Sequence, residues 1–492
     1  MDAAVAAVLT SFVAESPLTG LGAGGFMLVH DPGRGDALLD FFVEVPGHTV
    51  GERRSELVPI PVYFSPDSPQ VFNVGAASCG VPGTAAGLAE ALERFGSVPL
   101  AELVREPARL AREGVEVNAQ QAFIFQILDP ILTHQPEGKA IYAPAGRILS
   151  EGEVFRFPEL GDALERYGAE GPDPFYRGEV ARRVSEWVIE RGGTLGEDDL
   201  AGYEPREREP VSARYRGRDM LTNPPPSSGG LLIAFALGLL DLVGSSDVAS
   251  VVAAMEEAQV ARTEGFFHGL YEEGFVAEFL TPARFEEAAA RMRAGTRPAE
   301  PGHDGPADRL GSTTHITAVD GDGRCAAVTC SNGTGSGVIV PGTGVHVNNM
   351  LGEEDLNPLG FHVTPPGRRV PSMMSPTVVL RDGALEAGLG SGGSNRIRSA
   401  VLQTIIRVIA EGMDAQDAVS APRVHYEAGA VQVEPGVDEQ GLDTLARRGY
   451  QLVRWDDRNL FFGGVHAVVR DLDTGELSGG GDPRRGGAVA YA

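Results

Sequence analysis

The chain of 492 residues has little lysine and no long apolar run. Lys139 is the only lysine among 41 basic residues, and 68 acidic residues give a formal net charge of −27. Such a charge repels nucleic acid and anionic membrane surfaces, so neither is expected as a partner. The longest apolar run, 231–240, is well short of the roughly 20 residues that a membrane-spanning helix needs. We therefore expect no membrane span.

Cysteine is also scarce: Cys79, Cys325 and Cys330 form no CxxC pair and are too few for a disulfide framework. This predicts a reducing, cytoplasmic compartment. No basic segment precedes the first apolar stretch, so no secretory signal is visible. Because a helical pattern is already under way at Met1, we expect the natural chain to begin upstream, which leaves room for a signal peptide there. The sequence contains no HExxH and no Cys/His cluster, so no metal site is predicted.

Apolar residues make up 42% of the chain and charged residues 22%, as in ordinary globular proteins. Apolar residues at helical spacing between Gly83 and Gly96 predict a helix. Strand-like runs occur at 26–29, at 37–42 and repeatedly after residue 312, whereas 51–64 is expected to be irregular. Further helices are expected near 100–113, 177–192, 229–243, 247–265, 282–293 and 396–412. The mixture predicts an α+β protein of packed layers.

A segment without periodicity, 294–312, separates the two halves of the chain. It holds three prolines and four glycines and is expected to be a flexible loop. Directly beyond it, Thr313, His315 and Thr317 alternate with Thr314 and other residues as they would in a strand. Thr313 is therefore the expected first residue of a strand that follows a flexible loop.

Two segments match the G-x-G-x-x-G pattern, 20–25 and 388–393. A dinucleotide site needs a strand before the glycines and a helix after them. The first match runs into a strand and fails this test. The second follows a strand, opens a helix and has Asp414 about 20 residues later, but the residues around Asp414 have the pattern of a turn plus a helix. A cofactor-binding oxidoreductase, a cradle of backbone N–H groups for an anion or oxyanion, and a plain tight turn all stay open.

The Ser312–Thr313 step raises a chemical possibility. A threonine hydroxyl needs a base to become a nucleophile, and one solution uses the threonine's own α-amino group. That amine, with an ordinary pKa of roughly 7.7 to 8.0, suits proton transfer near neutral pH. It exists only if the peptide bond before Thr313 is cut. The alternative is that the threonines are simply strand-favouring residues.

Segments along nearly the whole chain resemble the γ-glutamyltransferases, also called glutathione hydrolases, of the N-terminal-nucleophile hydrolases. In family order they are DAAVAA, GLGAGGFMLV, GVPGTAAGLAEAL, PFYRGEVA, PPPSSGG, STTHITAVDGDGRCAAVT, NN at 348–349, SMMSPTVVLRDG, GSGGSNRIRSAVLQ and GDPRRGGA. The resemblance implies a four-layer αββα sandwich and a proenzyme that cuts itself. A large chain, 1–312, and a small chain, 313–492, would stay associated as one intertwined domain without a cofactor.

The resemblance also implies catalytic roles. Thr313 corresponds to the nucleophile, with its new amine as general base. Ser331 stands where the family has a threonine that hydrogen-bonds the nucleophile. Gly392 and Gly393 match the pair whose N–H groups form the oxyanion hole, donors that are worth several kcal/mol when charge develops on the oxygen.

Substrate-binding positions follow from the same motifs. Asn332 corresponds to a substrate-holding asparagine, and Ser372 to the first of two serines before MSPT. The family's aspartate for the substrate amino group falls on Glu353, with Glu354 and Asp355 as near alternatives.

Three departures from the family pattern fall among the positions that would bind the substrate's acyl group. The family has D-F-R-E-x-x-P, in which the arginine clamps the substrate α-carboxylate, but this chain has DFFVEVP with Phe42 in that place. A phenyl ring cannot replace the charge-assisted hydrogen bonds of a guanidinium. Met350 stands where a glutamine follows NN, and Met373 replaces the second serine. The chemistry is expected to be intact and the acyl pocket to be more apolar.

The sequence therefore predicts a self-processing amidohydrolase or acyltransferase that acts on γ-glutamyl amides such as glutathione. One alternative is an acylase for a less polar acyl chain, like the cephalosporin acylases of this family. The other is an unprocessed, non-catalytic binding relative.

Overall fold

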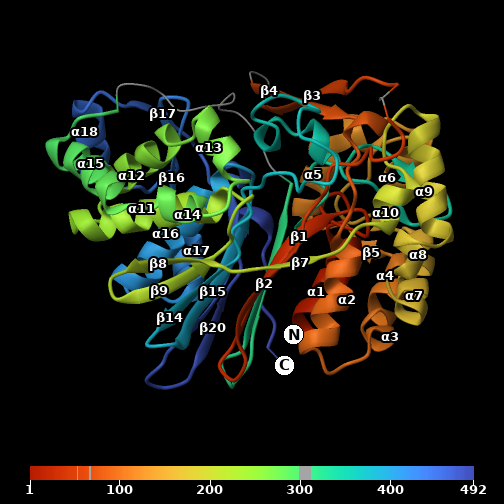
Figure 1. The fold of residues 1–492 in the computed structure, drawn as a ribbon, viewed down its shortest axis with the longest axis horizontal. Helices are drawn as coiled ribbons and strands as arrows, with labels where there is room; N and C mark the ends of the chain where they lie inside the picture. Colours follow the sequence, from red (N-terminus) through yellow and green to blue (C-terminus); the bar gives the residue numbers. More distant parts are fainter. Residues whose placement is uncertain (52–53, 66–67, 299–311, 492) are drawn as a thin grey trace.

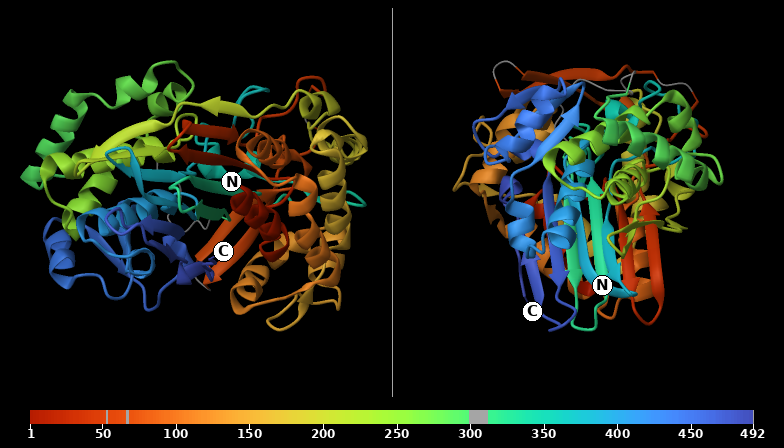
Figure 2. Two further views of the ribbon diagram at one scale, coloured as in Figure 1. Left: turned by 90° about the horizontal axis from the view of Figure 1, so that it is seen from below. Right: turned by 90° about the vertical axis from the view of Figure 1, so that its left-hand side faces the viewer.

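Two β-sheets face each other at the centre of the molecule, and helices cover the outer side of each (Figure 1). The structure, a computed structural model, describes residues 1–51, 54–65, 68–298 and 312–491. In the view from below in Figure 2, the strands of the two sheets lie next to each other between the two helical layers. This is the αββα arrangement that the resemblance implied.

The first sheet contains strands from both sides of residue 312. Its order is β10-β11-β1-β2-β7, with β1 and β11 antiparallel. The strands are β1 (Gly24–Asp31), β2 (Gly35–Phe41), β7 (Arg206–Arg208), β10 (Thr314–Val319) and β11 (Cys325–Ser331). Strands from the two halves of the chain are thus hydrogen-bonded neighbours.

The second sheet also contains strands from both sides of residue 312, in the order β20-β19-β15-β14-β9-β8. Its strands are β8 (Val211–Tyr215), β9 (Arg218–Thr222), β14 (Thr377–Arg381), β15 (Ala384–Gly392), β19 (Gly464–Arg470) and β20 (Leu477–Gly480). Short pairs and a small sheet surround the sandwich: β3 (Val58–Ser65) with β4 (Ser68–Val74), β5 (Val115–Glu116) with β6 (Val154–Phe155), β12 (Ile339–Val340) with β13 (Val345–His346), and β16 (Val424–Glu427), β17 (Ala430–Val433) and β18 (Gln451–Arg454).

The helices fall into two groups (Figure 1). On the side of the first sheet are α1 (Asp2–Ala14), α2 (Thr84–Phe95), α3 (Leu100–Leu103), α4 (Arg105–Glu113), α5 (Ala119–Leu132), α6 (Pro136–Tyr142), α7 (Pro158–Glu170), α8 (Asp173–Tyr176), α9 (Glu179–Glu190) and α10 (Glu197–Ala201). On the side of the second sheet are α11 (Gly229–Val243), α12 (Val248–Val260), α13 (Glu264–Gly269), α14 (Phe275–Phe279), α15 (Pro282–Ala294), α16 (Arg396–Ala410), α17 (Ala415–Ser420) and α18 (Glu439–Arg447).

Strand β1 shows why the layers stack as they do. Its side chains alternate in direction: Met27 and Val29 join the apolar core under the first helical layer, whereas Phe26 and Leu28 join a separate core that also holds Val378 of β14. A strand buried on both faces reads as a continuous apolar run because each face meets another layer. The core between the two sheets also includes Phe42 and Met350, two of the positions at which the chain departs from the family pattern.

Most of the expected elements are present, with two kinds of difference. The helix expected at 100–113 is divided into α3 and α4, and the one at 247–265 into α12 and α13. The expectation of irregular structure at 51–64 was wrong from Val58 onward, where β3 begins, whereas 54–57 lies in no helix or strand. Its prolines, Pro59 and Pro61, alternate with buried Ile60 and Val62 on a strand that, within the described ranges, pairs with β4 alone, and such an edge position tolerates the missing N–H.

Two further expectations concern the loop and the cysteines. The central part of the expected loop, 299–311, lies outside the described residues. The three cysteines are buried and form no disulfide. Among the described residues, no helix combines the length and the apolar character needed to cross a membrane.

Candidate active site

The predicted nucleophile lies where the ends of the two sheets meet. Thr313 directly precedes β10 in the first sheet, and Gly392 ends β15 in the second. A Cβ atom added to Gly392 would lie 2.2 Å from the carbonyl oxygen of Thr313, and one added to Gly393, whose φ is +129°, would lie 2.9 Å from the Cα of Gly463. Only glycine fits such close backbone approaches. The glycine pair therefore brings its backbone against the predicted nucleophile.

A hydrogen-bonded group surrounds the Ser312–Thr313 bond, which is uncut in this structure. The Thr313 hydroxyl donates to Oγ of Ser331 over 3.4 Å. The Ser331 hydroxyl in turn donates to the carbonyl oxygen of Ser312, and the Gly333 N–H donates to Ser331 Oγ over 2.8 Å. Ser331 thus touches both the predicted nucleophile and the carbonyl of the predicted cleavage site.

One pocket gathers most of the predicted site residues, and we call it the acyl pocket. Its cavity volume is about 40 Å³, which is room for only a few water molecules. The predicted residues that line it are Phe42, Ser312, Thr313, Ser331, Glu353 and Ser372. Gly392, Gly393 and Asn332 do not line it, although Gly392 contacts Thr313 and Asn332 follows Ser331 directly.

The side chain of Asn332 is fully buried next to this pocket. Its backbone N–H donates to the carbonyl of Leu18 over 2.8 Å. Within the described part of the chain, neither atom of its side-chain amide has a hydrogen-bond partner. A buried amide without partners is costly, so this group is a candidate to bind a polar ligand atom.

Two of the three candidate carboxylates line the acyl pocket, Glu353 and Asp355, whereas Glu354 is exposed. Glu353 accepts from the side-chain amide of Asn349 over 3.0 Å. Asp355 accepts from the hydroxyl of Ser394, which directly follows the glycine pair. The structure therefore adds Asp355 as a second acidic group beside the predicted Glu353.

The remaining wall of the acyl pocket is apolar. Phe42 is fully buried, stacks on Phe26 at 5.3 Å between ring centroids, and lines the pocket with Met350 and Met373. A buried arginine, Arg369, lies close by, since it donates to Glu44, two residues after Phe42.

The donors of Arg369 are directed away from the pocket. They go to the carboxylates of Asp40 and Glu44 and to the carbonyl of Glu204. Arg369 is also absent from the pocket lining. It therefore does not take the place of the arginine that Phe42 replaces.

Comparison with known proteins agrees with this geometry. The family model described as Gamma-glutamyltranspeptidase matches residues 1–492. The chain belongs to this family. It is 30% identical to the glutathione hydrolase proenzyme of Escherichia coli (strain K12), over 98% of this chain and 86% of that protein. It is 31% identical to the acylase ACY 1 proenzyme of Pseudomonas sp. (strain SE83), over 97% of this chain and 87% of that protein.

A solved structure gives the same result. The crystal structure of cephalosporin acylase from Bacillus halodurans matches with a TM-score of 0.82 and 27% identity, covering 99% of this chain and 90% of that one. The protein is thus an enzyme of the γ-glutamyltranspeptidase kind, with relatives named both as glutathione hydrolases and as acylases.

Family membership and structure together remove the dinucleotide interpretation of the second glycine motif. Strand β15 pairs antiparallel with its neighbours, whereas a dinucleotide fold needs parallel strands. Asp414 caps helix α17, accepting from the N–H of Asp417 over 2.8 Å. The turn plus helix expected around Asp414 is confirmed.

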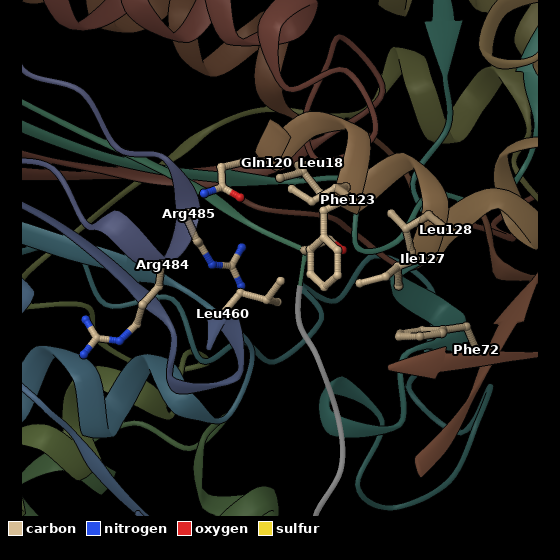
Figure 3. Close-up of a pocket in the computed structure, with 11 residues that line it drawn as sticks. Leu18, Phe72, Gln120, Phe123, Ile127, Leu128, Leu460, Arg484 and Arg485 are labelled. Carbon is tan, nitrogen blue, oxygen red and sulfur yellow. The ribbon is translucent and has the colours of Figure 1, made fainter. Parts of the chain in front are cut away.

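Arg485 was missed as a site residue, although it lies in the quoted motif GDPRRGGA. Its guanidinium donates to the carbonyl oxygen of Thr313 over 3.4 Å and lies beside Gly392. Burial lowers the pKa of Arg485 to about 10, so it remains a cation at neutral pH. The two consecutive arginines of this motif (Figure 3) were the only sign of Arg485 in the sequence, and they did not indicate that its side chain would contact Thr313.

Proposed function

We propose that this protein cuts itself between Ser312 and Thr313 and then acts as an amidohydrolase or acyltransferase with Thr313 as nucleophile. The observation that carries the proposal is the contact of Ser331 with both the Thr313 hydroxyl and the Ser312 carbonyl. An acyl shift needs a nucleophile close to a polarised carbonyl, and this hydrogen-bonded group contains both.

The cleavage would proceed through an ester. Thr313 Oγ adds to the Ser312 carbonyl carbon, the C–N bond breaks, and the Thr313 nitrogen takes up the proton to become a free amine. Water then hydrolyses the ester, which leaves a large chain, 1–312, and a small chain, 313–492. Because β1 and β11 are paired across this division, the two chains are expected to stay associated.

Turnover would repeat the same chemistry on a small amide. The free amine takes the proton from Thr313 Oγ, which adds to the substrate carbonyl, and the N–H groups of Gly392 and Gly393 stabilise the oxyanion. The leaving amine takes the proton. Water or a second amine then releases the acyl group from Thr313. The acyl pocket of the uncut chain has room for only a few water molecules, so movement of Ser312, once it is the free C-terminus of the large chain, would open it to substrate.

The acyl group has two candidate classes. The family and the carboxylates of Glu353 and Asp355 favour a γ-glutamyl group, whose ammonium either carboxylate can bind, with Asn332 and Ser372 as further polar contacts. The apolar wall of Phe42, Met350 and Met373 favours an acyl chain without an α-carboxylate, as expected of an acylase. We expect the protein to work without a cofactor, and its cytoplasmic location stays a prediction.

A denaturing gel of the purified protein and N-terminal sequencing test the proposal. We expect two fragments instead of one 51.8 kDa band, the smaller starting at Thr313. Thr313→Ala should block cleavage and turnover. Thr314→Ala is the matched control, since its hydroxyl donates to Glu15 instead, and it should still be cut. A single band in the wild type, or a cut and active Thr313→Ala variant, would refute the assignment and favour an unprocessed binding protein.

A further inference from the structure

A chain of hydrogen bonds runs from the acyl pocket toward the small sheet of β16, β17 and β18. It starts at Asp355, which lines the pocket. The hydroxyl of Ser394 donates to Oδ2 of Asp355, and the side-chain amide of Asn395 donates to Oδ1 over 3.1 Å. These two donors directly follow the glycine pair at the end of β15. Both oxygens of Asp355 are therefore bound by consecutive residues beside the predicted oxyanion hole.

The amide of Asn395 lies between two carboxylates. Asn395 is 1% exposed, and its Nδ2 also donates to Oε1 of Glu427 over 2.9 Å. Its Oδ1 has no hydrogen-bond partner within the described part of the chain, which is costly for a buried group. Turning the amide over would be worse, because its oxygen would then face two carboxylates that can only accept hydrogen bonds. The two carboxylates together fix which end of the amide is presented to Asp355.

Glu427, on β16, is a buried anion with a cation beside it. Nη1 of Arg396 lies 3.9 Å from Oε2 of Glu427, and the two side chains are 0% and 1% exposed. Nε2 of His425 lies 3.3 Å from the same oxygen, and its Nδ1 lies 2.7 Å from Oγ of Ser399. Burial alone would raise the pKa of Glu427, but Arg396 and His425 outweigh burial and lower the pKa to about 2. Glu427 therefore carries its charge at neutral pH.

Glu427 cannot touch a substrate in the acyl pocket, because it is buried and does not line the pocket. We infer that Glu427 is a positioning residue that orients the amide of Asn395, so that this amide holds the Asp355 carboxylate in the pocket wall for an ammonium group on the acyl chain. The inference rests on the proposed function. It adds to that function a residue of the small sheet, outside the sandwich, that sets the affinity for acyl groups with an ammonium.

Removing the charge of Glu427 frees the amide of Asn395 to turn. The side chain of a Glu427→Gln variant can donate as well as accept hydrogen bonds, so it can pair with either end of the Asn395 amide. In the turned orientation the oxygen of Asn395 faces Asp355, which loses a hydrogen-bond donor and is repelled. An ammonium at Asp355 would then be bound less tightly, whereas an acyl chain without a charge would not be affected.

The test compares two acyl groups that differ only at the far end of the chain. The 4-aminobutyryl anilide ends in an ammonium, and the pentanoyl anilide has a methyl group in its place, while both share one leaving amine. KM and kcat are measured with the processed enzyme. We expect Glu427→Gln to raise KM for the 4-aminobutyryl anilide about tenfold, the value of one hydrogen bond to a charged group, and to leave kcat unchanged. KM for the pentanoyl anilide should not change.

A second variant examines the connection through Asn395. Asn395→Ala removes the donor to Asp355 without changing any buried charge, so it should raise KM for the 4-aminobutyryl anilide selectively, even if Glu427→Gln does not fold. The double variant should be no worse than Asn395→Ala alone, because Glu427 acts through this amide. Effects of the two substitutions that simply add would overturn the inference.

Glu257→Gln is the control for the loss of a buried carboxylate. Glu257 is 4% exposed, pairs with Arg291 over 2.7 Å and does not line the acyl pocket, so both KM values should stay as in the wild type. The inference is overturned if Glu427→Gln leaves KM for the 4-aminobutyryl anilide unchanged, changes KM for both anilides alike, or lowers kcat instead. If no anilide is turned over, or no cleavage occurs, the proposed function itself fails.

Discussion

The Ser331 hydroxyl donates a hydrogen bond to the carbonyl oxygen of Ser312. This places a proton donor on the oxygen that would carry negative charge if Thr313 Oγ added to the Ser312 carbonyl. Because the Gly333 N–H donates to the same Ser331 oxygen, the serine hydroxyl is held in this orientation. Ser331 is therefore predicted to promote the cleavage step itself and, after cleavage, to hold the Thr313 nucleophile in position.

Replacing Ser331 by alanine should slow self-cleavage by about 10²–10³-fold, as loss of one oxyanion donor does in other acyl transfers. The measurement is the time course of fragment formation on denaturing gels after expression. Ser331→Thr keeps a hydroxyl and should restore most of the rate. Ser11→Ala is the control, because Ser11 is a buried serine that donates to a backbone carbonyl within α1. Equal cleavage rates for Ser331→Ala and wild type would show that this hydroxyl has no catalytic part.

The close approach of Gly392 to Thr313 gives a steric prediction. A Cβ at Gly392 would lie 2.2 Å from the Thr313 carbonyl oxygen, whereas nothing lies within 4 Å of a Cβ at Gly321. Gly392→Ala should therefore displace Thr313 and prevent both cleavage and turnover, and Gly321→Ala should leave both unchanged. Circular dichroism would establish that the Gly392→Ala chain is folded. A folded variant that is cut at the wild-type rate would contradict the geometry.

The candidate site could be predicted in part because its chemistry lies in short motifs. Thr313, Ser331 and the glycine pair each fall in a contiguous segment whose local pattern is informative, and the substitutions at Phe42, Met350 and Met373 meet at one pocket. Asp355 could not be chosen over its neighbours from the sequence. Its place depends on a hydrogen bond to Ser394, a contact between segments 39 residues apart.

The fold was predictable where periodicity is strong and was missed where it is mixed. Helix α2 follows directly from its apolar spacing. Helix α5 was not predicted, because it contains Pro130 and its apolar residues face both the core and a pocket. Strand β3 was missed because Pro59 and Pro61 interrupt the usual strand pattern, although both residues pair with β4, opposite Asn73 and Val71.

The apolar wall of the acyl pocket makes a prediction about the acyl group. Phe42, Met350 and Met373 offer no guanidinium to an α-carboxylate, so a γ-glutamyl group should gain little over a 4-aminobutyryl group, which keeps the ammonium and lacks that carboxylate. Initial rates on γ-glutamyl and 4-aminobutyryl anilides, which share one leaving amine, measure this. We expect 4-aminobutyryl turnover to equal or exceed γ-glutamyl turnover. A strong preference for γ-glutamyl would show that other groups bind the α-carboxylate.

The two carboxylates of the acyl pocket can be separated by mutation. Asp355→Asn should raise KM for the γ-glutamyl anilide about tenfold, since a hydrogen bond between charged groups is lost. A glutaryl anilide keeps the carboxylate but has no ammonium, so its KM should not rise. Glu354→Gln is the control, because Glu354 is exposed and does not line the pocket. If Glu353→Gln alone gives this selective effect, the amino group binds Glu353 instead.

A buried histidine should make stability depend on pH. Burial lowers the pKa of His346 to about 4, and neither ring nitrogen has a hydrogen-bond partner among the described residues. In the unfolded chain the pKa is about 6.5, so between these values the unfolded state binds more protons and the free energy of unfolding falls as the pH drops. From pH 7.5 to pH 5 this one group should cost about 2 kcal/mol. Urea unfolding of wild type and His346→Leu at both pH values measures the difference. The variant should lose less stability on acidification, and an identical loss in both proteins would mean that His346 is already protonated, or hydrogen-bonded, in the folded state.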